Sequence, residues 1–154
     1  MSAADSPSVH FPPPLMFASA LAVGILIDGN VMKSWPAFHV AQFAAFAIFL
    51  VGLTIIAATL GLFRRHRTRP EPWQPAANLI EGGLYRRSRN PMYLGMTLAA
   101  AGVALFFESV VAAILVGIVI VILDRVVIAR EEAYLQRRFG PDYEAYRRQV
   151  RRWL

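Results

Sequence analysis

Four long apolar stretches limit the folds open to this chain more than any other feature. They cover residues 12–27, 37–63, 92–107 and 109–128 of a 154-residue sequence. A helix needs about 20 residues to cross a hydrocarbon core of about 30 Å, and each stretch is close to that length. Hydrophobic residues make up 56% of the chain, which is high for a soluble domain. The pattern predicts an all-α integral membrane helical bundle with about four transmembrane helices, followed by C-terminal cytoplasmic or interfacial helices.

The basic residues indicate orientation and partners. The formal net charge is +6, and every arginine lies within residues 64–89 or 125–152. Under the positive-inside rule both segments are cytoplasmic, so we expect an integral protein of a bacterial inner membrane with both termini in the cytoplasm. Membrane lipids or an acidic small molecule are expected partners, and nucleic acid is not. With no cysteine and three scattered histidines, no metal site is expected, and no pattern fixes an oligomeric state.

The chain is expected to form one membrane domain over residues 1–154. Its parts are two N-terminal spans (12–63), a cytoplasmic loop (64–91), a helical hairpin (92–128) and C-terminal interfacial helices that complete the site (129–154). Three prolines rule out a regular helix in the loop, and Trp73 is expected at the membrane interface. The apolar end of the loop, with Leu84 and Tyr85, is expected to fold back on the site.

A single residue, Glu108, separates the third and fourth apolar stretches. Only a tight helical hairpin fits so short a connection, so these two spans are predicted to be antiparallel neighbours. The start of the third span and the end of the fourth then lie at the same membrane face. Two polar clusters therefore have to converge there: residues 89–91 (Arg-Asn-Pro) and the segment 124–132, which ends in Glu131 and Glu132.

Both clusters also have purely structural explanations. Asn90 is a favoured helix cap, and Pro91 suits the first helical position. The charges of segment 124–132 can form an ion-pair ladder within one helix. Beyond it, a helix is expected to stop at Gly140, and Asp142 is expected to cap another.

The last predicted helix is amphipathic. Tyr143, Tyr146, Val150 and Trp153 share one face, opposite several arginines. Such a helix is expected to lie in the membrane interface, with its aromatic side chains toward the lipid and its arginines toward the headgroups.

The converging clusters predict a binding site with mixed chemistry. The start of a helix offers free N–H groups and a positive dipole end, which suit a carboxylate or a phosphate. Glu131 and Glu132 offer acceptors for hydroxyl and ammonium groups, while Tyr85 and Tyr93 provide an apolar wall. A zwitterionic, hydroxyl-bearing cofactor with a flat ring fits these features.

Two motifs carry a family resemblance. The runs LYRRSRNPMYLGM (84–96) and REEAYLQRRFGPDYEAYRRQVRRWL (130–154) resemble the isoprenylcysteine carboxyl methyltransferase and phospholipid methyltransferase superfamily of integral membrane enzymes. Its signatures are Arg-His-Pro-x-Tyr-x-Gly and a Glu-Glu pair before Phe-Gly-x-x-Tyr-x-x-Tyr. Asn90 stands where histidine is usual, and asparagine cannot titrate near neutral pH, which argues against a general base at this position.

The resemblance implies an S-adenosylmethionine-dependent membrane methyltransferase that releases S-adenosylhomocysteine. Its acceptor would be lipidic or hydrophobic, either the carboxylate of an isoprenylcysteine-like molecule or a phospholipid amine, at the cytoplasmic face. The implied catalytic residues are Arg89, Asn90 and Glu132. The implied cofactor-binding residues are Leu84, Tyr85, Arg89, Asn90, Pro91, Tyr93, Gly95, Glu131, Glu132, Tyr143 and Tyr146. Two alternatives stay open: an NADPH-dependent membrane reductase related to the sterol reductases, and a membrane scaffold without enzymatic activity.

Overall fold

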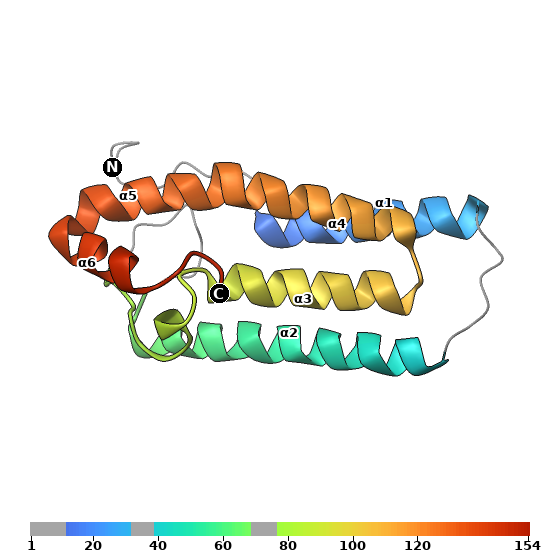
Figure 1. Ribbon diagram of the computed structural model, residues 1–154, viewed down its shortest axis with the longest axis horizontal. Helices are drawn as coiled ribbons and strands as arrows, with labels where there is room; N and C mark the ends of the chain where they lie inside the picture. The colour runs from blue at the N-terminus through green and yellow to red at the C-terminus, as the bar shows by residue number, and fades with distance from the viewer. Residues whose placement is uncertain (1–11, 32–38, 69–76) are drawn as a thin grey trace.

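A computed structural model describes residues 12–31, 39–68 and 77–154, and these residues form helices and no strand (Figure 1). In chain order the elements are α1 (Pro13–Val31), α2 (His39–Arg65), η2 (Gly83–Arg86, a 3₁₀ turn), α3 (Pro91–Phe106), α4 (Val110–Ile122), η3 (Leu123–Ile128, a π-helical segment), α5 (Ala129–Phe139) and α6 (Pro141–Gln149). The predicted all-α class is confirmed. The expected proline-rich interfacial loop around Trp73 falls outside the described residues.

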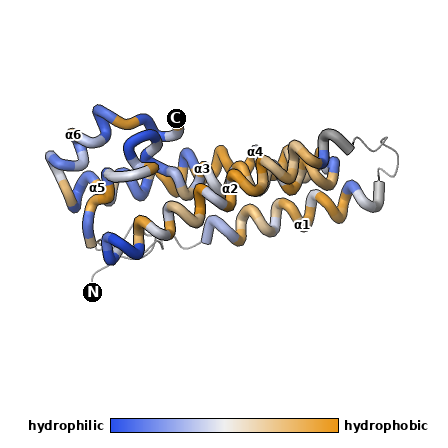
Figure 2. The backbone as a smooth tube through the Cα atoms, turned by 90° about the horizontal axis from the view of Figure 1, so that it is seen from below, coloured by the Kyte–Doolittle hydropathy of each residue, from blue (hydrophilic) through white to orange (hydrophobic). Residues whose placement is uncertain are grey.

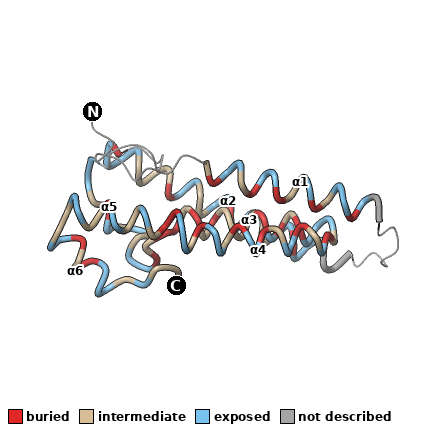
Figure 3. Tube along the Cα trace, turned by 90° about the horizontal axis from the view of Figure 1, so that it is seen from above, coloured by how far each residue is buried: buried red, intermediate tan, exposed pale blue. Residues whose placement is uncertain are grey.

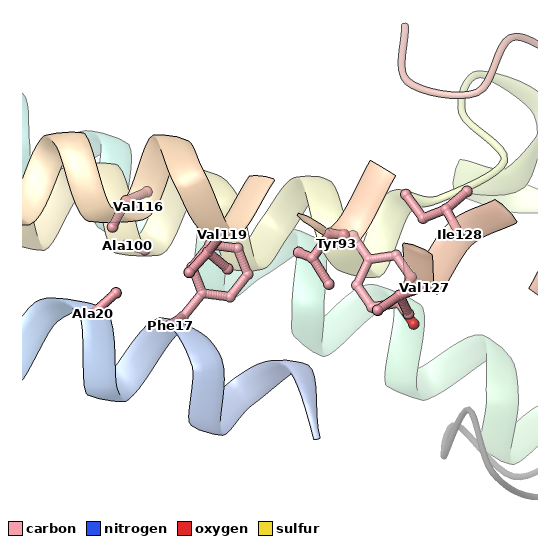
Figure 4. Close-up of a cluster of buried hydrophobic side chains, with 9 residues drawn as sticks. Phe17, Ala20, Tyr93, Ala100, Val116, Val119, Val127 and Ile128 are labelled. Carbon is pink, nitrogen blue, oxygen red and sulfur yellow. The ribbon is translucent and has the colours of Figure 1, made fainter. Parts of the chain in front are cut away.

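The long helices run side by side along one axis of the molecule (Figure 1). α2 packs against α3, α1 packs mainly against α4, and α3 also touches α1 and α4. Buried residues recur at intervals along the helices (Figure 3). The core consists of Phe17, Ala20, Tyr93, Ala100, Val116, Val119, Leu123, Val127 and Ile128 (Figure 4).

The outside of the bundle is apolar along most of its length and hydrophilic at the end that carries α5 and α6 (Figure 2). Phe43 of α2 and Val121 of α4, for example, have 76% and 60% of their surface exposed. Large apolar faces of this kind suit a lipid surrounding. Among the described residues, α2 and the continuous helix Val110–Phe139 are long and apolar enough to cross a membrane, whereas α1 and α3 are shorter apolar helices.

The fourth apolar stretch does not end where a separate helix begins. α4, η3 and α5 form one unbroken helix, Val110–Phe139. The π-helical segment inside it has wider turns than an α-helix and shifts the faces of all residues that follow. A π segment leaves no simple signature in an apolar sequence, so we did not predict it.

The tight hairpin between α3 and α4 is confirmed. Phe107, Glu108 and Ser109 make the turn, and Glu108 adopts a left-handed conformation with a φ of 53°. Ser109 caps α4 by accepting a hydrogen bond from the Ala112 N–H at 3.0 Å. Its hydroxyl donates to Asp28 of α1, so the turn is fastened to the first helix.

Glycines let α2 and α3 approach closely. A Cβ atom at Gly52 would lie 2.4 Å from the Ala99 nitrogen and 2.6 Å from the Gly95 oxygen, and both of these atoms are backbone. We expect Gly52→Ala to lower the free energy of unfolding by about 1–3 kcal/mol, a typical cost of overpacking. Thermal unfolding in detergent would measure the loss.

The matched control for this substitution is Gly117→Ala in α4. A Cβ atom at Gly117 meets nothing within 4 Å. Alanine is favoured over glycine inside a helix by about 1 kcal/mol, so this variant should be as stable as the wild type or more stable. Equal losses in the two variants would contradict the inferred close contact.

Candidate active site at the polar end of the bundle

The two polar clusters meet at the hydrophilic end of the bundle. Nη2 of Arg89, just before α3, lies 3.1 Å from Oε1 of Glu132 on α5. Tyr93 of α3 donates its hydroxyl to Oε1 of Glu131 at 2.5 Å. These contacts join α3 to α5, so the two glutamates have partners outside their own helix.

The adjacent carboxylates face two different surroundings. Glu131 lies among tyrosines, because Tyr93 donates to it and its charge acts on Tyr85. Burial, the charge of Glu131 and the neighbouring Tyr146 raise the pKa of Tyr85. Glu132 instead lies among guanidinium groups. One carboxylate is therefore held by a neutral hydroxyl and the other by cations.

Residues 150–154, which we call the return segment, explain part of this geometry. α6 ends at Gln149, and Val150 is extended. The Arg89 N–H donates to the Arg151 carbonyl at 2.9 Å, so the return segment lies against the start of α3 (Figure 1). The expectation that one helix runs on to Trp153 is wrong, because the backbone leaves the helix to bond with α3.

The two tyrosines of α6 are also placed differently from the expectation. Tyr143 and Tyr146 are 1% and 6% exposed, so they point into the protein and not toward lipid. The Tyr146 hydroxyl donates to the Tyr85 carbonyl at 2.9 Å, which ties α6 to η2. Burial raises the pKa of Tyr146, so this hydroxyl stays protonated and able to donate.

The predicted helix caps are wrong in their chemistry. Asn90 occupies the cap position of α3 and Pro91 follows as the first helical residue, but the Asn90 side chain makes no capping hydrogen bond. Its Nδ2 donates to the Arg152 carbonyl at 3.0 Å. Asp142 does not cap α6 either, because α6 starts at Pro141 and Gly140 holds the cap position. Asn90 thus joins α3 to the return segment.

Arg152 connects more of the site than any residue named in the sequence analysis. Its Nε and Nη2 donate to the two oxygens of Glu132 at 3.1 and 2.6 Å. Its Nη1 lies 3.2 Å from both oxygens of Asp124, and the Trp153 indole also donates to Asp124 at 2.9 Å. Hydrogen bonds to Glu132 raise the pKa of Arg152. An aspartate at the end of an apolar run is the signal that could have indicated a charged partner.

The Arg89 guanidinium has two donor atoms without a hydrogen-bond partner among the described residues. Its side chain is 11% exposed, and its Nε and Nη1 are buried without a hydrogen-bond partner among the described residues. Tyr143 lies close by: burial and the Glu132 charge raise the pKa of Tyr143, while the Arg89 charge and a side-chain hydrogen bond with Arg89 lower it. Buried donors without partners cost free energy. An anionic ligand group would satisfy them.

Three other expected site residues, Leu84, Pro91 and Gly95, serve helix packing or backbone hydrogen bonding. Leu84 is partly buried, and its carbonyl accepts from the N–H groups of Arg87 and Ser88. Pro91 is fully buried at the first turn of α3. Gly95 approaches Gly52 of α2, so its missing side chain serves helix packing.

One protein family and two known proteins match parts of this chain. Residues 40–142 match the sequence profile of the phospholipid methyltransferase family. An uncharacterized protein of Haemophilus influenzae is 40% identical over 63 residues, which are 41% of this chain and all of that protein. A protein-S-isoprenylcysteine O-methyltransferase of Schizosaccharomyces pombe is 35% identical over 72 residues, which are 47% of this chain and 30% of that enzyme. No solved structure matches.

Proposed function

Because the chain belongs to the phospholipid methyltransferase family, we propose that this membrane methyltransferase uses S-adenosylmethionine and acts on a lipidic or hydrophobic acceptor. The observation that carries the proposal is the pair of unpartnered donors on Arg89, buried beside Tyr143 and Glu132. A family member needs a place for the carboxylate of the cofactor, and guanidinium donors form strong charge-assisted hydrogen bonds with a carboxylate.

The residues at the site fit S-adenosylmethionine. Arg89 would hold the carboxylate, and Glu131 would accept from the ammonium group or the ribose hydroxyls. Tyr143 and Tyr146, with ring centroids 6.2 Å apart, are buried and would support the site from α6. When bound, the cofactor supplies an activated methyl group, so the chain has to align the reactants and exclude water.

Glu132 and Asn90 would orient the residues that contact the cofactor. Glu132 would hold the Arg89 guanidinium at one edge, and Asn90 would keep the return segment beside α3. Asn90 has no titration near neutral pH and so provides no general base. A carboxylate acceptor needs none, whereas a phospholipid amine would have to lose a proton before the transfer.

We place the site at the cytoplasmic face of a bacterial inner membrane, because the arginines gather at that end. In this arrangement α1, α2, α3 and the Val110–Phe139 helix are the four crossings of one domain, and both termini are cytoplasmic. α3 has 16 residues, or about 24 Å. It lies between α2 and α4, so a length below the hydrocarbon thickness is tolerable. A hydrophobic acceptor would enter sideways from the bilayer.

The direct test is binding of S-adenosylhomocysteine by isothermal titration calorimetry, in detergent and in lipid nanodiscs. We expect saturable binding with one site per chain. Absence of heat in both media would contradict the proposal, and binding of NADPH in its place would favour a reductase. Incubation with labelled S-adenosylmethionine, followed by mass analysis of the lipid extract, would then identify the acceptor.

A further inference from the structure

We infer that Arg152 is a positioning residue for this site: it fixes Glu132, and through Glu132 it sets the direction in which Arg89 presents its free donors. The inference rests on the proposed function and adds a residue from the return segment. No part of the Arg-Asn-Pro or Glu-Glu motif contains it.

The first argument is the occupancy of the Glu132 carboxylate. Arg152 donates to both of its oxygens, at 3.1 and 2.6 Å, in the two-pronged geometry that fixes a carboxylate plane. Arg89 reaches only Oε1, through Nη2, at 3.1 Å. The plane set by Arg152 therefore determines where Arg89 makes its one contact. Nε and Nη1 of Arg89 are then left without a hydrogen-bond partner among the described residues.

The second argument is the anchor that holds Arg152 itself. Nη1 lies 3.2 Å from both oxygens of Asp124. Residues eight apart on an α-helix are about 80° apart around its axis, so Asp124 and Glu132 would not normally share a face. The π-helical segment η3 adds roughly one residue to the turns between them, which brings the two residues to within about 20° of one line. The bulge thus lets one guanidinium bridge both carboxylates.

The third argument comes from the backbone of the same residue. The Arg152 carbonyl accepts from Asn90 Nδ2 at 3.0 Å and from the Ser88 hydroxyl at 3.3 Å. The preceding carbonyl, of Arg151, accepts from the Arg89 N–H. Both ends of Arg89, its backbone and its guanidinium, are therefore placed by the return segment.

Lysine cannot replace this arginine. A single ammonium cannot donate in parallel to two Glu132 oxygens and also reach Asp124, although it preserves the charge. Arg152→Lys therefore removes the geometry and keeps the electrostatics, which makes it the most informative substitution.

The experiment compares wild type, Arg152→Lys and Asp124→Asn in nanodiscs. Each is titrated with S-adenosylhomocysteine, and the thermal midpoint is measured without ligand. We expect Arg152→Lys to weaken binding about tenfold and Asp124→Asn to weaken it about threefold, as loss of one to two charge-assisted hydrogen bonds would do. Neither variant should lose more than a few degrees in midpoint.

Arg151→Ala is the matched control, because its side chain is exposed and its carbonyl remains. It should behave as wild type in both measurements. A lower midpoint with unchanged affinity in Arg152→Lys would make Arg152 merely structural and would overturn the inference. Tighter binding would overturn it too, because the return segment would then obstruct the site. If Arg152→Lys does not fold, the Asp124→Asn affinity decides by the same criteria. Failure of the wild type to bind would instead refute the proposed function.

Discussion

Replacing Glu132 with alanine is expected to lower the free energy of unfolding by about 3 kcal/mol and to abolish S-adenosylhomocysteine binding. The Glu132 side chain is 13% exposed and pairs with Arg89 and Arg152. Its removal leaves two guanidinium groups close together with no shared anion, and Arg89 would lose the one carboxylate that pairs with it among the described residues. Chemical denaturation in detergent gives the stability, and calorimetry gives the binding.

The control for this variant is Glu144→Ala. Glu144 also pairs with an arginine, Arg148, but this pair lies on the exposed side of α6, with 77% of the Arg148 side chain accessible. Exposed pairs four residues apart contribute only about 0.3–0.5 kcal/mol. A Glu132 variant that unfolds and binds like the Glu144 variant would rule out an essential pairing at the site.

The second large effect is expected for Arg89→Lys. The ammonium can still pair with Glu132, so stability should fall little. The two unpartnered donors, Nε and Nη1, are lost, and hydrogen bonds to charged groups contribute about 1.5–3 kcal/mol each. We therefore expect S-adenosylhomocysteine to bind at least about 100-fold more weakly, since each 1.4 kcal/mol changes affinity tenfold. Calorimetry on the folded variant measures this directly.

Arg87→Lys is the corresponding control, because Arg87 is exposed two residues away. Its affinity should match the wild type. Wild-type affinity in Arg89→Lys as well would mean that the cofactor carboxylate lies elsewhere. The unpartnered donors of Arg89 would then no longer support the proposed function.

The sequence could predict the features that follow from chain connectivity. A one-residue gap at Glu108 required a tight hairpin, and the hairpin required residues 89–91 and 131–132 to end at one face. The structure has both features. The all-α class could be predicted from the length of the apolar stretches. Only a helix provides backbone hydrogen bonds within so long an apolar stretch in lipid.

What escaped prediction depends on contacts between distant residues. Periodicity assigned Arg152 and Trp153 to a helix in the membrane interface, since an amphipathic pattern cannot reveal that the backbone bonds to Arg89 instead. Asn90 has a high cap propensity, but the Arg152 carbonyl competes successfully for its amide. The π segment arises inside an ordinary apolar run. In each case tertiary hydrogen bonds override a local preference.

The fastening of α1 bears on how the protein assembles. Asp28 receives hydrogen bonds from the Ser109 hydroxyl and the Val111 N–H, and α1 packs chiefly on α4. The ribosome makes about 80 further residues before these partners exist. Asp28 therefore has to remain without these two partners until they are made, while α2 and α3 can dock soon after they are made. Closure of the bundle by α1 is then a late event, and synthesis halted before Ser109 would leave that helix without its anchor.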